Sequence, residues 1–439
     1  MNPVKVTIQG NFWDCQIYRG RLYLFTVDGT IKTINWNKLV ESLQTDDYTN
    51  VAMAYAFKNG RNLYHPELSD LFKDNDVKAL LKGKFESLAS HVIEISDSDL
   101  NQFLIGEQDS PFEELHTDSE VLSNKFYVLT HNSLASVAIH RDSKRYPVQR
   151  SVVKHFDINA FAIRANKFAK MAVSAGDDGL MEYNGSESLD MTFYDDRRMT
   201  QVSNRHSSFA DYSFLSIYNS SLTAQSFLSY YTWRENRNQS NPERVKRGEF
   251  DESNIFESYP ERQAYLSWGS HEKIYRAVNG GLDVVRFNNY AKPGEPIFSS
   301  SKFIPLQLWK GNVLSASIAY FGTVLHCENA VVVMLSDGSF YNIHGEASRV
   351  RIFPRSLNYE NHLHVIQDDH LEVYSFNNDY FVDQKDKDFG FAYRVPKMFG
   401  LYRRYNSLFE SDEEFYDFDD ENINPNPPPP TTNLDDLPF

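Results

Sequence analysis

Along most of the chain, short apolar runs alternate with tight polar turns, and a second run with apolar residues at alternating positions follows each turn. This pattern is typical of half-buried β-strands joined as hairpins. The clearest copies place Asp-Gly in the turn, at residues 28–29, 178–179 and 337–338. Asp-Gly favours a type I′ turn, which needs positive φ at both central residues, so each copy predicts a hairpin.

The hairpin pattern recurs in seven segments, and several of the intervals between their turns lie near the ~40–50 residues of a four-stranded propeller blade. The segments are 22–36, 126–140, 172–184, 214–227, 274–287, 331–343 and 364–376. A lone hairpin cannot cover both of its faces, and radial stacking of such sheets leaves only short protected edges. The sequence therefore predicts an all-β fold, a β-propeller of about seven irregular blades, over residues 1–409.

Two intervals between turns do not fit one blade each. The first is much too long, and within 38–120 it contains Pro66, which suits a helix start, followed by apolar residues at helical spacing. These are Leu68, Leu71, Phe72, Val77, Leu80, Leu81, Phe85 and Leu88. We therefore expect a helical insertion at about 62–105. The interval from 337 to 369 is too short, which leaves two explanations. Either one hairpin is an inner pair and the other an outer pair, or the N-terminal strand closes the ring.

In its hairpins, the body resembles WD40-type β-propellers over most of residues 1–405. It lacks the Gly-His and Trp-Asp dipeptides that recur in each repeat of that family. The resemblance implies an architecture and no activity, because propellers serve both as scaffolds and as enzymes.

The composition is that of a globular protein: 41% of the 439 residues are hydrophobic and 24% are charged. An aromatic content of 14% favours β structure. No apolar run reaches the ~18 residues of a membrane span, and the N-terminus lacks the pattern of a signal peptide. Cys15 and Cys327 are too few for a disulfide framework or a four-cysteine zinc site, and we expect both to be small buried residues. These features predict a cytoplasmic protein without membrane association.

Most of the formal net charge of −16 belongs to the C-terminal tail. After Arg404 the chain has ten acidic residues and no Lys or Arg, which leaves the rest of the chain at only about −6. The tail consists of an acidic, aromatic run at 410–421, a proline-rich spacer at 422–433 and a tip at 434–439. Dense like charges and four consecutive prolines favour an extended chain, so we expect 410–433 to be a disordered linker.

Motifs of the common enzyme classes are missing, including the P-loop, GxGxxG after a strand, HExxH and GxSxG. We therefore expect no catalytic activity and no cofactor. One cluster has metal-ligand chemistry: His362 and His364 share a strand face, and His370 follows beyond a turn with Asp368 and Asp369. The alternative is a solvated hairpin in which the Asp-Asp pair supplies the turn.

Basic and aromatic residues interleave at 140–156, 244–250 and 393–405, as in proteins that neutralise phosphates and stack on bases. The candidate nucleic-acid-binding residues are Arg141, Lys144, Arg145, Arg150, Arg394, Lys397, Tyr402, Arg403, Arg404 and Tyr405. We favour the simpler interpretation that these cations lie on solvated loops or pair with the acidic run. An anionic, aromatic tail could also occupy a basic groove and be displaced by single-stranded DNA.

The last residues of the chain are its most specific feature. Asp435, Asp436, Leu437, Pro438 and Phe439 resemble the acidic tip of bacterial single-stranded DNA-binding protein (SSB), which ends in Asp residues, an aliphatic residue, Pro and Phe. Here two consecutive Asp residues stand where SSB often has three. The resemblance covers the tip and, loosely, the order of body, linker and tip.

Such a tip has the chemistry of a docking peptide. Phe439 offers a ring to an apolar pocket while its α-carboxylate can meet an Arg or Lys at the rim, which a Phe inside the chain cannot do. Pro438 lowers the entropy lost on binding, and the two aspartates add attraction to a basic surface. The resemblance implies partners that recognise the SSB tip, namely recombination mediators, primosome and RecQ-type helicases, exonucleases and clamp-loader subunits.

The sequence thus favours a non-enzymatic propeller adaptor whose tip docks onto such proteins, in DNA replication, repair, recombination or a phage–host contest over them. A second protein would bind a propeller face. Two alternatives stay open. One is a single-stranded nucleic-acid-binding protein autoinhibited by its acidic tail, and the other is a propeller enzyme with a His/Asp metal site.

Overall fold

The structure is a computed structural model, and the chain divides into two compact units, Met1–Tyr393 and Arg394–Phe439. All described residues belong to the first unit. They are 1–43, 47–60, 74–112, 114–140, 147–166, 170–185, 199–212, 216–234, 243–257, 264–269, 273–288, 291, 294–305, 313–356 and 358–382.

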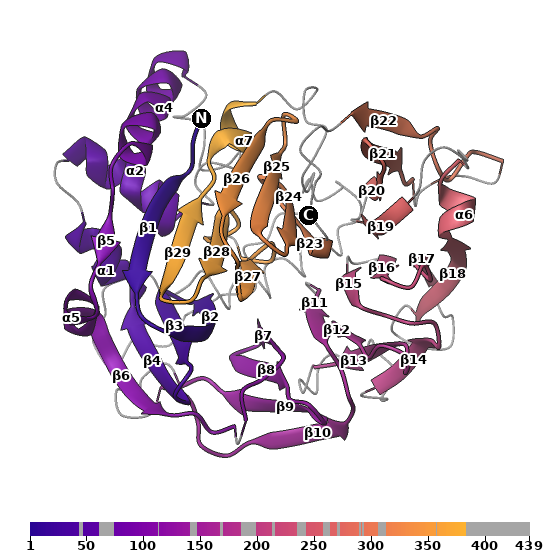
Figure 1. Ribbon diagram of the computed structural model, residues 1–439, viewed down its shortest axis with the longest axis horizontal. Helices are drawn as coiled ribbons and strands as arrows, with labels where there is room; N and C mark the ends of the chain where they lie inside the picture. The colour runs from indigo at the N-terminus through magenta and orange to yellow at the C-terminus, as the bar shows by residue number, and fades with distance from the viewer. Residues whose placement is uncertain are drawn as a thin grey trace, which may run out of the picture. The chain divides into compact units, whose positions relative to one another are not determined.

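Seven antiparallel sheets stand around a common axis in this unit, which is a seven-bladed β-propeller (Figure 1). Blades 1 to 6 follow one another along the chain and have four strands each, the first-named being innermost. Blade 1 has β2 (Phe12–Tyr18), β3 (Arg21–Thr26), β4 (Thr30–Asn35) and β6 (Leu104–Asp109). Blade 2 has β7 (Asp118–Leu122), β8 (Lys125–Leu129), β9 (Ser133–Ala138) and β10 (Val153–Asp157). Blade 3 has β11 (Ala162–Ala165), β12 (Lys170–Ser174), β13 (Leu180–Asn184) and β14 (Met199–Ser203). Blade 4 has β15 (Phe209–Tyr212), β16 (Ser216–Ser220), β17 (Phe227–Arg234) and β18 (Glu243–Asp251). Blade 5 has β19 (Ala264–Gly269), β20 (Lys273–Val278), β21 (Gly281–Arg286) and β22 (Lys302–Pro305). Blade 6 has β23 (Val313–Ala319), β24 (Gly322–Cys327), β25 (Ala330–Leu335) and β26 (Phe340–His344). The predicted fold class is confirmed.

Blade 7 joins the two ends of the described chain. It comprises β27 (Arg349–Ile352), β28 (His362–Ile366), β29 (His370–Ser375) and the N-terminal strand β1 (Val4–Gln9). Strand β1 runs antiparallel to β29, with Val4 opposite Ser375 and Gln9 opposite His370. The ring is therefore closed by hydrogen bonds between the first and last strands.

Of the two explanations of the short interval before residue 369, closure of the ring by the N-terminal strand is confirmed, and the other is correct for one hairpin only. The hairpin at 331–343 is the outer pair of blade 6, β25 and β26, but the hairpin at 364–376 is the middle pair of blade 7, β28 and β29, and not an inner pair. The fourth strand of blade 7 comes from the N-terminus. The hairpin at 331–343 therefore lies one strand further out in its blade than the hairpin at 364–376. This difference shortens the interval between their two turns, although no blade is missing.

The Asp-Gly turns have a different geometry from the one predicted. Gly29, Gly179 and Gly338 have φ of 86°, 93° and 83°, but none of the aspartates before them has positive φ. The Gly338 amide donates to Leu335 O at 2.8 Å, closing a turn that ends in a left-handed glycine. This is a three-residue loop with a glycine bulge, so the type I′ prediction is wrong although the hairpins are present.

The helical insertion lies between the third and fourth strands of blade 1, on the outer side of β1 (Figure 1). Its elements are α1 (Trp36–Ser42), α2 (Asp47–Phe57), α4 (Asn75–Ala89), β5 (Glu94–Ile95), α5 (Asp97–Leu100) and the 3₁₀ helix η2 (Asn101–Phe103). Helices thus begin at Trp36, before the expected start near 62. Residues 61–73, including Pro66, lie outside the described residues. Short helices α6 (Glu252–Ile255) and α7 (Asn378–Phe381) occur elsewhere, and none of the helices described is long and apolar enough to cross a membrane.

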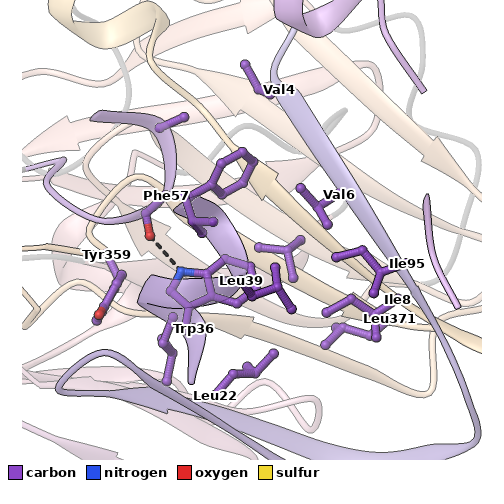
Figure 2. Packing of buried hydrophobic residues seen from close by; sticks show 14 of the residues in the cluster. Val4, Val6, Ile8, Leu22, Trp36, Leu39, Phe57, Ile95, Tyr359 and Leu371 are labelled. Atoms are coloured by element: carbon purple, nitrogen blue, oxygen red, sulfur yellow. Dashed lines mark hydrogen bonds between the residues drawn. The ribbon is translucent and has the colours of Figure 1, made fainter. Parts of the chain in front are cut away.

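The insertion is packed against the propeller through a shared apolar core. Trp36 is completely buried, and its Nε1 donates to Phe57 O at 2.7 Å. Figure 2 shows Trp36 and Phe57 beside Val4 and Val6, with Leu22 of blade 1 and Leu371 of blade 7 in the same cluster. The insertion therefore covers the joint between the first and last blades, where β5 also pairs in parallel with β1.

Candidate functional site

The innermost strands around the axis are linked by side chains that reach from one blade to the next. Asp118 of β7 accepts a hydrogen bond from the Ile163 amide of β11 at 2.8 Å, and Glu120 accepts from the Ala165 amide at 3.3 Å. The inner edge of each sheet has backbone groups without a strand partner, and buried amides of that kind need acceptors. Carboxylates on β7 therefore cap the inner edge of blade 3.

A buried ion-pair network joins blades 7, 1 and 2 at the centre of the ring. Arg351 of β27 donates from Nε and Nη2 to the two carboxylate oxygens of Asp14 on β2, at 2.8 and 2.7 Å. Its Nη1 donates to the carboxylate of Asp118 and, at 3.1 Å, to Ser119 O on β7. Arg351 is 3% exposed and Asp14 is fully buried, so this is a desolvated clamp.

The carboxylate of Asp14 has further donors. Ser119 Oγ donates to Asp14 Oδ2 at 2.6 Å, and His116 Nε2 lies 2.6 Å from the same oxygen. Burial alone would raise the pKa of Asp14, but Arg351 and the His116 hydrogen bond outweigh it and hold that pKa well below its usual value. At Asp118 burial also raises the pKa, but Arg351, Arg164, Arg349 and the Ile163 amide together outweigh it and lower the pKa. Both carboxylates are therefore ionised, and their oxygens already accept hydrogen bonds from neighbouring blades. This arrangement suits a role in joining blades and does not suit proton transfer.

Asp211 on β15 is the opposite case. Its Oδ2 is buried without a hydrogen-bond partner. Burial raises the pKa of this carboxyl to about 7, against the smaller opposing effects of Arg164 and the Gly269 amide. Arg164 itself extends from β11 to Ser317 on β23, where Nη2 donates to Oγ at 2.9 Å. The side chains on this side of the ring therefore also bridge inner strands.

His362 and His364 lie together, as their shared strand face predicts, in a chain of hydrogen bonds inside the insertion joint. His362 Nε2 is 3.1 Å from Ala56 O, His362 Nδ1 is 3.4 Å from His364 Nε2, and His364 Nδ1 is 3.4 Å from Cys15 Sγ. The carbonyl oxygen of Ala56 can only accept, which makes His362 Nε2 a donor and fixes each later donor in turn: His364 Nε2–H and then the Cys15 thiol. Burial lowers the pKa of His362 to about 3 and that of His364 well below its usual value, so both rings are neutral.

His370 does not join the other two histidines. Its Nδ1 is 2.6 Å from Asp369 Oδ1 and its Nε2 is 3.8 Å from Glu372, at the surface end of the hairpin. Within the described residues, no group of three or more His, Cys, Asp or Glu side chains is arranged to hold a metal ion. The placement of His362, His364 and His370 therefore gives the metal hypothesis no support.

Cys15 and Cys327 are buried, as expected. Burial raises the pKa of the Cys15 thiol far above its usual value and that of Cys327 to about 11. The thiol of Cys15 is therefore a hydrogen-bond donor and not an activated nucleophile. Its contact with His364 had no signal in the sequence, because the two residues are 349 positions apart.

The nucleic-acid candidates are only partly placed. Arg150 is exposed in the connection between β9 and β10. In the same basic segment, Lys154 forms an ion pair with Asp157, and His155 lies 2.8 Å from Ser136 Oγ and 3.0 Å from the Tyr183 hydroxyl. The other candidates lie outside the described residues: Arg141, Lys144, Arg145, Arg394, Lys397, Tyr402, Arg403, Arg404, Tyr405, and the tip residues Asp435, Asp436, Leu437, Pro438 and Phe439.

Comparison with known proteins gives similarity of structure alone. No protein-family model matches the chain, and no curated protein matches it. Among solved structures, it is similar to the computationally designed Ika8 protein, with a TM-score of 0.40 and 6% identity over 85% of this chain and 100% of that one. It is also similar to the Pan2 WD40 domain of Neurospora crassa, with a TM-score of 0.41 and 6% identity over 84% and 90% of the two chains. At these scores neither likeness supports an argument about function.

Proposed function

We propose that this chain is a non-enzymatic β-propeller adaptor whose C-terminal tip docks onto proteins that recognise the SSB tip. The observation that carries the proposal is the terminal sequence Leu434-Asp435-Asp436-Leu437-Pro438-Phe439. It joins a terminal ring and carboxylate to a proline and two negative charges, which together match an apolar pocket with a basic rim.

The architecture of the ring is compatible with this role. Among the described residues, the strands of all seven blades lie between Val4 and Ser375. The closing hydrogen bonds between β1 and β29 join residues 4–9 to residues 370–375. The tip residues at 434–439 follow the last described strand in the sequence.

The chemistry at the centre of the ring favours an adaptor over an enzyme. The Asp14 and Asp118 carboxylates are held by Arg351, and the Cys15 thiol is protonated and buried. General bases and nucleophiles need available lone pairs and suitable pKa values, which these three groups lack. Asp211 differs from them, because its Oδ2 has no hydrogen-bond partner and burial raises its pKa to about 7.

The proposal is tested with purified proteins that bind the SSB tip, such as a RecQ-type helicase and an exonuclease. Each is immobilised and exposed to the full chain, to a chain lacking Phe439, and to a matched Asn433→Ala variant in the spacer. We expect the wild type and Asn433→Ala to be retained and the Phe439 deletion to be lost. Equal retention of all three chains, or of none, would overturn the proposal.

A further inference from the structure

One face of the propeller is formed by the turns between second and third strands together with the connections between blades. Backbone hydrogen bonds join these segments in blades 7, 1 and 2: Gly10 N to Asp369 O at 2.9 Å, Ser110 N to Gly29 O at 2.8 Å and Ile158 N to Asn132 O at 3.0 Å. We call this the turn face. Its described residues are 10–11, 27–29, 110–112, 114–117, 130–132, 158–161, 175–179, 204–208, 221–226, 252–257, 279–280, 328–329, 345–348 and 367–369, together with the first residues of the inner strands.

Large apolar side chains are exposed on the turn face in most of the blades. The exposed fractions are 51% for Val27, 42% for Leu115, 54% for Phe161, 54% for Leu222, 50% for Tyr265 and 45% for Leu314. Tyr265 and Leu314 belong to the turn face because each is the second residue of an inner strand, β19 or β23. The first residues of these strands, Ala264 and Val313, pair with Val278 and Cys327, which come directly before the turns at 279–280 and 328–329. Scattered single apolar residues are ordinary on a protein surface. Here one of them lies on the same face in each of six blades.

The exposed charges described on the turn face are mostly negative. Its exposed carboxylates are Asp28, Glu114, Asp177, Asp178, Glu257, Glu328, Glu346, Asp368 and Asp369. Among the described residues of this face, the Lys or Arg residues are Arg205, which is paired with Asp251 and Glu249, and Arg349 at the start of β27, which donates to Thr117 O. Hydrogen bonds from Thr26 to Asp28 and from His370 to Asp369 lower the pKa of those carboxyls, which keeps them ionised.

Cations lie at the opposite ends of the blades. Arg19 and Arg150 stand in connections on that side, and Lys125 and Lys302 begin strands there. Exposed carboxylates occur there too, at Glu295 and Asp337, so the ends of the blades opposite the turn face carry charges of both signs.

We propose that the turn face binds a segment of a partner protein that carries Lys or Arg together with apolar anchor side chains. The exposed apolar residues would receive the anchors, and the surrounding carboxylates would attract the cations and disfavour acidic competitors. This inference assigns a face and a chemistry to the second partner of the adaptor, and it does not depend on the tip at Phe439.

The test uses a defined probe, a labelled nonapeptide that alternates Lys or Arg with Leu, Trp and Phe, and a matched peptide with Glu in place of each cation. We expect the full chain to bind the basic peptide and not the acidic one, with affinity falling as salt is added. Hydrogen exchange on the complex should show protection in the turn-face segments. Phe439→Ala should bind the probe as the wild type does, which separates this proposal from tip docking.

Matched variants locate the binding surface. Reversing Asp177, Glu346 and Asp368 to Lys should weaken binding about tenfold or more, whereas Glu86→Lys, Glu94→Lys and Glu107→Lys together change the net charge equally and should have little effect. Likewise, Phe161→Ser with Leu222→Ser should weaken binding more than Leu80→Ser with Val92→Ser on the insertion.

Three outcomes would overturn the proposal: no binding of the basic peptide, equal weakening by both sets of charge reversals, or protection away from the turn face. Because the hydrogen-exchange readout uses the wild-type chain, it decides the matter even if a variant fails to fold.

Discussion

At the scale of single residues, the main feature is two sets of buried polar side chains that are hydrogen-bonded to one another. Arg351 is positioned by two carboxylates and a carbonyl, and the His362–His364–Cys15 chain by the single carbonyl of Ala56. Buried polar groups of this kind cost stability when a partner is removed, because the remaining group loses hydration without compensation. Their effect is therefore on stability and on the spacing of blades.

Replacing Arg351 with Met should leave Asp14 and Asp118 buried without their cation. We expect a loss of about 3–5 kcal/mol in the free energy of unfolding, measured by urea denaturation at pH 7. The control is Arg150→Met, which removes an exposed cation from a connection and should change stability by less than about 0.5 kcal/mol. A loss for Arg351→Met no larger than that of the control would contradict the clamp.

The neutral histidines predict a specific pH dependence. His362 and His364 have pKa values depressed in the folded state, so the unfolded chain binds more protons below the ordinary histidine pKa of about 6.5. Their contribution is fully present above that pH and declines as the pH falls towards about 3. Stability measured from pH 7 to pH 5 should therefore decrease.

Removing the titrating rings should flatten this dependence. The variant His362→Gln with His364→Leu should be less stable at pH 7 but lose less stability between pH 7 and pH 5 than the wild type. His370→Gln, at the exposed end of the hairpin, should keep the wild-type slope. An unchanged slope in the double variant would show that the buried rings are not the groups that titrate.

At the scale of elements, side chains of blade 7 and of α1 hold the last turn of α2. From blade 7, Asn361 Nδ2 donates to Ala56 O at 3.0 Å and His362 reaches the same carbonyl. From α1, Trp36 donates to Phe57 O. The last carbonyls of a helix have no partner within it, so these side chains replace the missing bonds. The insertion is thereby held at the joint between the two ends of the ring.

Asn361→Ala should loosen α2 before it opens the ring. We expect faster amide exchange in 47–57 and 75–89, and a loss of about 0.5–1.5 kcal/mol in stability from the hydrogen bond lost at Ala56 O, which keeps its bond to His362. Exchange in the inner strands of blades 3 to 5 serves as the internal control and should be unchanged. Uniform acceleration across all blades would contradict local fastening.

The elements also show what the sequence can predict. Alternating apolar residues and Asp-Gly turns located all seven hairpins, because local pairing leaves a local pattern. The insertion was only partly predicted: Leu81, Phe85 and Leu88 are buried at helical spacing in α4, but Asn35 already caps a helix at Trp36. The Arg351–Asp14 pair had no local signal, since its residues are 337 positions apart and meet only when the ring closes.

At the scale of the whole molecule, the two proposals assign two partners to different parts of the chain. The turn face of the ring is proposed to bind one partner, and the tip is proposed to bind another. If the two sites are independent, removing one should leave the other intact. The probe peptide and an SSB-tip-binding protein should accordingly bind the wild-type chain at the same time, as measured by co-sedimentation, with mutual exclusion contradicting independence.

Competition for an SSB-tip pocket tests the central claim most directly. A labelled SSB tip peptide is bound to a RecQ-type helicase, and its release is followed by fluorescence anisotropy as the full chain is added. We predict displacement by the wild type, and none by a chain extended with one Gly after Phe439, because the extension moves the terminal carboxylate away from the ring. Equal displacement by the extended chain, or none by the wild type, would contradict the account.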